Sequence, residues 1–424
     1  MLRHAYSVLS RRQVVIFVNY TKSGTIKRLP LTNIFYQQVH CSPSQSNPID
    51  FRLTRPMFWP FSSNSRTSVS EADLVDLRGK VAIVTGSNAG IGYSTVQFLA
   101  RKGAKVYMAA RSEAKALEAI KQLEAEDLWG GQVEWLRLDL SDMKQTKEAA
   151  LEIFEKEKRL DILGMLLSRY PNGEMDSLTD GDLVNNAAMV VGPFKKTADG
   201  LLDIMVVKYV TFDLWESTHL KFISSQSHIS HFIFTMTLVP LMKQTSNESP
   251  LADVRIINVT SEVHQIVPPV ATFAGEGCLS HQYEESVMGY LRTYGYTKLA
   301  NILFTKELQR RLSLEGFTNI VCIAAHPGSV TTPGSQRFMG SIPYISWITK
   351  TLNSWFSYPQ RAGAFTSVFA AASPEVKAEP EKYRGAYLIP VARIAKPSKN
   401  AQDERLAKEL WETTEAKLKE LSML

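Results

Sequence analysis

The chain has 424 residues, 44% hydrophobic and 21% charged, which is ordinary for a soluble globular protein with a sizeable core. Its length fits one large α/β domain with additions, or two domains. The net charge of +6 is concentrated in residues 1–56, which carry eight basic side chains and one acidic side chain. The remainder carries 40 basic and 41 acidic side chains, so a basic surface for nucleic acid is not indicated.

Cysteine and histidine usage predicts neither a disulfide framework nor a metal site. Cys41, Cys278 and Cys322 form no CxxC pair, and no carboxylate or cysteine pattern completes a ligand set around His228 and His231. A reducing compartment fits this usage, and we expect a cytoplasmic protein. No apolar run reaches the roughly 18 residues of a membrane span.

The N-terminal region, residues 1–78, is expected to be a poorly ordered extension. Its first part is rich in Arg, contains Ser and is poor in acids, which resembles a mitochondrial transit peptide, although it lacks a clean amphipathic helical period. The alternative is that the true start is Met57, which opens a short N-terminus of its own.

From residue 79, short β-branched runs alternate with segments of helical periodicity. We expect strands at 80–86, 105–110, 133–140, 160–163, 254–261 and 319–328, and helices at 91–102, 113–126, 143–157 and 290–312. This alternation predicts an α/β protein with a Rossmann-type, doubly wound parallel sheet in a single domain, residues 79–400. A charged amphipathic helix follows within 401–424.

The segment TGSNAGIG, residues 85–92, follows the first expected strand and opens a helix. Gly86 permits the tight turn, Gly90 lets the backbone approach a pyrophosphate, and Gly92 lets the helix pack closely on the strand. The helix N-terminus offers unpaired N–H groups to an anion. The segment therefore predicts a dinucleotide site, in which Ser87, Asn88 and Ile91 are the remaining contact residues.

Two further positions bear on the cofactor. Many NAD sites place an acidic residue at the end of the second strand, but this chain has Arg111 there, which can pair with a 2′-phosphate and favours NADP. Asp139 ends the third expected strand and can accept from the adenine amino group. The alternatives are a solvated Arg111 and a turn or N-cap role for Asp139.

Tyr294 and Lys298, in YGYTK, are four residues apart on an expected helix and so share one face. A neighbouring ammonium and a cationic nicotinamide should lower the pKa of the phenol, so that Tyr294 can act as a general acid or base. Lys298 can also hold the nicotinamide ribose. Ser261 ends the fifth expected strand and can donate to a substrate carbonyl. Together the three residues predict a catalytic site for hydride transfer.

These motifs resemble the classical short-chain dehydrogenase/reductase family over residues 79–395. Thr85–Gly92 matches its TGxxxGxG, Ser261 its catalytic Ser, and Tyr294 with Lys298 its YxxxK. Asn185–Ala188 matches its NNAG motif, so the resemblance places Asn186 and Ala187 at the cofactor. HPGSVTT matches its PG motif, which implies that Pro327, Gly328, Val330 and Thr332 lie near the nicotinamide. YGYTKLAN resembles the retinol-dehydrogenase-like sub-group of the family, and the sequence resembles the fungal members of that sub-group.

The resemblance implies an NADP-dependent enzyme, with NAD less favoured, that acts on a small hydrophobic aldehyde, ketone or alcohol. It also implies that the apolar, aromatic segment 335–360 forms part of the substrate pocket and contacts a membrane surface. The extended relatives use TGxxGxxG, which argues against an epimerase here.

Two segments interrupt the family pattern. Residues 164–183 separate the fourth strand, ending at Leu163, from the motif that begins at Val184. Residues 208–227 stand where the resemblance places a single Asn, the fourth catalytic residue, before HISHF.

We interpret both segments as translated introns. Gly164–Leu166 and Lys208–Val210 can each be encoded with GTATGT, a common fungal splice donor, and removal of both segments restores the family motifs. The hypothesis predicts a split strand, a lost relay Asn, and little or no activity in the chain as written. The alternative function is therefore a nucleotide-binding but catalytically impaired protein.

Overall fold

An eight-stranded sheet forms the centre of the molecule in the computed structural model, which describes residues 68–166, 228–284, 286–328 and 359–424. The strand order is β3-β2-β1-β4-β5-β6-β7-β8, parallel except for β8, which runs antiparallel to β7. The strands are β1 (Val81–Thr85), β2 (Lys105–Ala110), β3 (Gln132–Arg137), β4 (Ile162–Met165), β5 (Val254–Val259), β6 (Ile320–Ala325), β7 (Tyr387–Ile389) and β8 (Arg393–Ala395).

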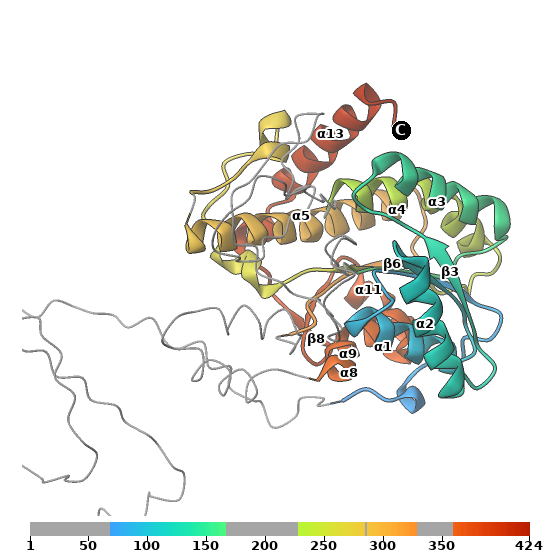
Figure 1. Cartoon of the computed structure of the whole chain (residues 1–424). Helices are drawn as coiled ribbons and strands as arrows, with labels where there is room; N and C mark the ends of the chain where they lie inside the picture. The colour runs from blue at the N-terminus through green and yellow to red at the C-terminus, as the bar shows by residue number, and fades with distance from the viewer. Residues whose placement is uncertain (1–67, 167–227, 285, 329–358) are drawn as a thin grey trace, which may run out of the picture. The chain divides into compact units, whose positions relative to one another are not determined.

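Helices cover both faces of this sheet (Figure 1). One face carries α3 (Met143–Lys156), α4 (Ile229–Asn247) and α5 (Val287–Leu314), with α13 (Glu404–Glu420) packed on α5. The other carries α1 (Gly90–Arg101), α2 (Glu113–Ala125) and α9 (Phe365–Ala372). The short helices are η1 (Glu71–Asp73), η2 (Glu262–Ile266), η3 (Glu276–Ser280), α8 (Gln360–Gly363), α10 (Pro374–Ala378), α11 (Pro380–Tyr383) and α12 (Lys399–Gln402). The prediction of a doubly wound Rossmann-type sheet is confirmed.

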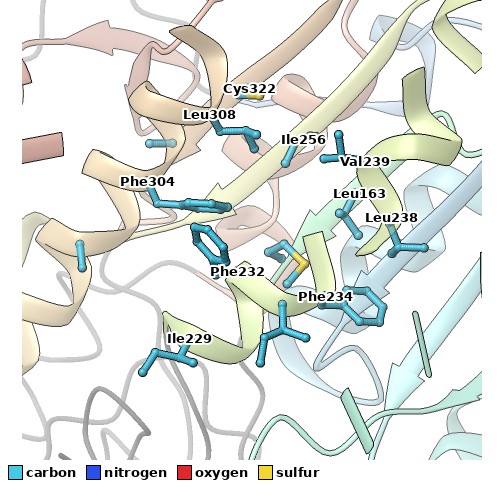
Figure 2. Packing of buried hydrophobic residues seen from close by; sticks show 14 of the residues in the cluster. Leu163, Ile229, Phe232, Phe234, Leu238, Val239, Ile256, Phe304, Leu308 and Cys322 are labelled. Carbon is cyan, nitrogen blue, oxygen red and sulfur yellow. The ribbon is translucent and has the colours of Figure 1, made fainter. Parts of the chain in front are cut away.

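The sheet separates two hydrophobic clusters because successive side chains of a strand point to opposite faces. In β1, Val81 and Ile83 join the cluster under α3, α4 and α5, whereas Ala82 and Val84 join the cluster under α1. Figure 2 shows the first cluster, where Phe232 and Phe304 meet from α4 and α5 above the sheet. All five residues of β1 are buried, as expected for an interior parallel strand.

The structure corrects the expected boundaries at both ends of the domain. Residues 68–78 are not loosely attached, since Val69, Leu74 and Leu77 are buried against the cluster under α1. At the other end, α13 is part of the domain, because Leu410 and Trp411 belong to the cluster under α5. Within the described part of the chain, no helix is long and apolar enough to cross a membrane.

The fourth strand differs from the expectation that it ends at Leu163. β4 continues through Gly164, which pairs with Val84 of β1, and Met165, which pairs with Asn258 of β5. Leu166 is also buried, and its carbonyl accepts a hydrogen bond from the Thr85 hydroxyl. The first residues of the segment 164–183 are apolar or lack a side chain, so they complete the strand in register. The rest of that segment, and all of 208–227, lie outside the described residues.

Candidate functional site

The strand order reverses between β1 and β4, and the crevice at the carboxyl ends of such neighbouring strands is where open α/β sheets bind ligands. The Gly-rich loop leaves β1 at this point. Gly86 and Gly90 have φ of 57° and 63°, which favours glycine at both positions. A Cβ on Gly92 would lie 2.5 Å from the Gly86 carbonyl oxygen. The backbone of Gly86 fits the predicted turn and Gly92 has no room for a side chain, whereas the approach of Gly90 to a pyrophosphate stays a prediction.

The loop also presents the start of α1 to the crevice. The N-cap residue is Ala89, so no side chain caps the first turn, and the N-terminus keeps backbone N–H groups for an anion. Ser87 is buried, and its hydroxyl donates to the Val84 carbonyl at 2.6 Å, which fixes the loop. Asn88 lies half-buried beside it. This uncapped, glycine-lined turn fits the pyrophosphate of a dinucleotide.

The two residues expected at the adenosine end lie on neighbouring strands. Arg111 directly follows β2, as a residue meeting a 2′-phosphate must. Asp139 lies two residues beyond β3, and its Oδ1 accepts from the Ser141 backbone N–H at 2.9 Å and from the Ser141 hydroxyl at 2.6 Å. The turn role for Asp139 is thus present, and its contact with adenine stays a prediction.

The structure brings Ser261, Tyr294 and Lys298 together. Ser261 lies two residues beyond β5, and its side chain lies beside the Tyr294 phenol on α5, where it opposes the rise of the phenol's pKa. The Lys298 ammonium lies 5.6 Å from the centroid of the Tyr294 ring and 3.4 Å from the Val259 carbonyl oxygen. The Thr260 hydroxyl donates to the Lys298 carbonyl at 2.8 Å, which ties the helix to the end of β5.

Burial sets the protonation of this group in a way that the sequence analysis did not anticipate. It raises the pKa of Tyr294 to about 12, against the opposing effect of the Ser261 hydrogen bond. It also lowers the pKa of Lys298 to about 8. Burial is the largest cause of both shifts, and Lys298 is not among the causes of the shift at Tyr294. A bound cationic nicotinamide is the second group that we expected to lower the pKa of the Tyr294 phenol. The expected lowering of the phenol's pKa by Lys298 and a bound nicotinamide therefore stays a prediction.

Other predicted cofactor residues divide between described and undescribed parts of the chain. Pro327 and Gly328 follow β6 at the same sheet edge, and Gly328 has φ of 86°. Asn186, Ala187, Val330, Thr332 and residues 335–358 lie outside the described residues. Among the residues that the structure does describe, no His, Cys, Asp and Glu side chains cluster to hold a metal ion.

Sequence reasoning missed two buried polar residues beside the predicted catalytic residues. The Asn301 amide lies 3.4 Å from the same Val259 carbonyl oxygen that Lys298 approaches. His264 lies one 3₁₀ turn after Ser261 and is fully buried. The available signal was spacing, since Asn301 lies seven residues after Tyr294 on one helix and His264 three residues after Ser261.

Comparisons with known proteins agree with this geometry. Residues 80–207 match the family model for short chain dehydrogenases. The chain is 38% identical to a short-chain dehydrogenase/reductase of Armillaria gallica over 84% of this chain and 98% of the relative. The chain belongs to the short-chain dehydrogenase/reductase family. This membership confirms the resemblance, and by family the protein is an NAD(P)-dependent oxidoreductase.

Two further proteins are similar to this chain. It is 30% identical to mouse retinol dehydrogenase 14 over 80% of this chain and 86% of that protein, in line with the predicted sub-group. An uncharacterized protein from Mycobacterium paratuberculosis shares the fold, with a TM-score of 0.53 and 24% identity, over 83% of this chain and 98% of the other.

Proposed function

We propose that the protein uses NADP(H) and interconverts an alcohol and a carbonyl in a small hydrophobic substrate. The observation that carries the proposal is the meeting of Ser261 with the Tyr294 phenol, with Lys298 against the phenol ring, at the sheet edge that also carries the glycine-lined turn. Arg111 at the end of β2 supports NADP over NAD, since a guanidinium pairs well with a 2′-phosphate.

The chain's residues divide the chemistry in a simple way. When bound, the nicotinamide supplies or accepts the hydride at the substrate carbon. The Ser261 hydroxyl donates to the substrate oxygen and polarises the carbonyl. Tyr294 gives its proton to that oxygen during reduction and takes it back during oxidation. Lys298 favours loss of the phenol proton by its charge, which it carries below its pKa of about 8.

A second candidate function is nucleotide binding with impaired turnover. Gly164 and Met165 of β4, and then Leu166, follow Leu163 at the positions where the family's strand runs directly into its Asn-Asn motif. In addition, the match to the family model ends at Val207, the residue before the segment 208–227. The end of the match supports the interpretation that the segment 208–227 does not belong to a working enzyme of this family, whereas the segment 164–183 lies within the match.

The cofactor assignment can be tested by binding alone, so it does not depend on turnover. Replacing Arg111 with Ala should weaken NADPH binding about 10- to 100-fold in calorimetric titration, which corresponds to one lost charged hydrogen-bonding pair. NADH binding should change less than about threefold on the same basis. Arg405→Ala, on the exposed face of α13, is the matched control. Equal losses for both nucleotides would contradict NADP selectivity through Arg111.

A further inference from the structure

His264 connects the backbone of the catalytic serine to the C-terminal part of the chain. Its Nδ1 lies 2.7 Å from the Ser261 carbonyl oxygen, and its Nε2 lies 3.0 Å from the Ser398 backbone nitrogen. Ser398 is the N-cap of α12, 134 residues further along the chain. The imidazole is fully buried and meets the edge of the Tyr387 ring, with 5.1 Å between the centroids.

The two partners fix the tautomer of the ring. A carbonyl oxygen can only accept, so Nδ1 must carry the hydrogen, and a backbone N–H can only donate, so Nε2 must be the acceptor. One neutral imidazole thus satisfies both contacts. Burial also lowers the pKa of His264, which agrees with a neutral ring.

The Ser261 carbonyl is held from two directions. It accepts from the His264 ring at 2.7 Å and from the His264 backbone N–H at 3.2 Å, which uses both of its lone pairs. Ser261 itself lies outside β5, so the strand's ladder does not fix its backbone. The ring contact is therefore a restraint on the residue whose hydroxyl meets Tyr294.

We propose that His264 is a positioning residue, which holds the Ser261 backbone so that the serine hydroxyl faces Tyr294 and the substrate oxygen. The proposal rests on the proposed function, because it assigns the serine hydroxyl its part in carbonyl chemistry. His264 touches neither reacting atoms nor cofactor in this account. It affects the reaction only by holding Ser261. A residue that merely packs in the core would not depend on Ser261 in this way.

Substitution of His264 by Asn or by Gln places an amide near one of the two ring nitrogens and so keeps one of the two contacts. In His264→Asn the amide nitrogen lies near the former Nδ1 and keeps a donor for the Ser261 carbonyl. In His264→Gln the amide lies near the former Nε2 and keeps an acceptor for the Ser398 N–H, while the serine carbonyl loses its ring partner. A packing role predicts similar effects from both, whereas positioning predicts that only His264→Gln disturbs Ser261.

The first experiment measures kcat for NADPH oxidation with decanal in the full chain. We expect His264→Asn to stay within about threefold of the parent and His264→Gln to lose about tenfold or more, the scale of one hydrogen bond of about 1.5 kcal/mol. In a Ser261→Ala background, His264→Gln should cause no further loss. Equal losses in the two single variants, or a full additional loss in the Ser261→Ala background, would overturn the proposal.

A second readout does not require turnover. In the full chain carrying ¹³C-labelled tyrosine, the Cζ resonance of Tyr294, assigned with Tyr294→Phe, reports its hydrogen bond with Ser261. We expect Ser261→Ala and His264→Gln to shift this resonance in the same direction and His264→Asn to leave it in place. An unmoved resonance in His264→Gln would refute positioning. Absence of turnover both in the full chain and in the chain that lacks the two interrupting segments would instead count against the proposed function, so the two failures are distinguishable.

Discussion

At the scale of single residues, the site holds two ionisable groups in buried surroundings, Lys298 fully and Tyr294 in part. Tyr294 and Lys298 face each other across 5.6 Å, and burial moves the pKa of the phenol up to about 12 and that of the ammonium down to about 8. Each shift disfavours the charged form of its group. A site that holds groups in disfavoured environments sacrifices stability for function, and this has a measurable consequence at Lys298.

Replacing Lys298 with Met should stabilise the protein at pH 7. Lys298 has a pKa of about 8 in the folded protein, below the ordinary 10.5, so the unfolded chain binds this proton more tightly. The resulting loss of folding stability is fully present below pH 8 and disappears as the pH rises toward 10.5. The pKa difference corresponds to at most about 3 kcal/mol. Thermal unfolding without added nucleotide should show a higher Tm for Lys298→Met at pH 7 and a smaller gain above pH 10. Lys408→Met, on an exposed lysine, is the control, and a lower Tm for Lys298→Met would contradict this account.

Replacing Gly92 with Ala should damage both the fold and the nucleotide site. The added Cβ would lie 2.5 Å from the Gly86 carbonyl oxygen and 2.6 Å from the Ser87 Cα, so the turn must shift. We expect a loss of about 1–3 kcal/mol in the free energy of unfolding, the usual cost of overpacking, together with much weaker NADPH binding. Gly277→Ala is the matched control, because a Cβ there meets nothing within 4 Å. Unchanged NADPH affinity in Gly92→Ala would argue against the pyrophosphate assignment.

At the scale of elements, the C-terminal helix α13 closes the core over α5. Trp411 packs on Phe232 and Phe304 with ring centroids 4.8 Å and 5.8 Å away, and the Arg311 guanidinium lies 4.5 Å from its ring. The helix thus joins α4 and α5 into one cluster. Since α5 also carries Tyr294 and Lys298, the packing of α13 on α5 helps to fix the helix that holds these two residues.

Replacing Trp411 with Ala should cost about 3–5 kcal/mol of unfolding free energy, the usual range for a large buried aromatic. Urea denaturation followed by circular dichroism measures this loss. Trp129→Ala is the matched control, because Trp129 is 58% exposed and its one described ring contact is with Arg101. That substitution should cost less than about 1 kcal/mol. Comparable losses from the two substitutions would mean that α13 adds little to the core.

The sequence was sufficient for elements with a strong period and insufficient for those fixed by tertiary contacts. β1, α1 and α5 follow from β-branched runs and helical spacing, and their predicted bounds lie within a few residues of the structure. β7 and β8 have three residues each and were not predicted as strands, because pairing with β6 and with each other decides their conformation. The role of His264 was equally invisible, since its partner Ser398 is distant in sequence.

At the scale of the whole molecule, the sheet accommodates the first residues of the segment 164–183. These residues take the place of the family's Asn-Asn motif directly after Leu163, at the edge of the sheet where the cofactor is expected. β4 is an interior strand between β1 and β5, and Gly164 and Met165 are part of its pairing. The strand is therefore complete, and the disturbance lies at the carboxyl end that faces the dinucleotide site. This placement favours an effect on activity over a general loss of folding.

Removing both segments should raise activity. The altered chain joins Leu163 to Val184 and replaces residues 208–227 with one Asn, which restores both family motifs. We expect NADPH oxidation with decanal to rise at least about 100-fold, within the range attributed to a positioned proton-transfer group. A chain with only 164–183 removed separates the two effects. Equal activity in the full and shortened chains would show that the segments are tolerated insertions.

The central claim is that a half-buried phenol, Tyr294, beside Ser261 and Lys298, transfers the proton during hydride transfer. The most direct measurement is single-turnover oxidation of NADPH by the shortened chain and by its Tyr294→Phe variant, with NADPH affinity measured in parallel. We predict that the rate falls about 10²- to 10⁴-fold while the affinity changes less than about threefold. Full turnover by the Tyr294→Phe variant, with NADPH bound normally, would contradict the account.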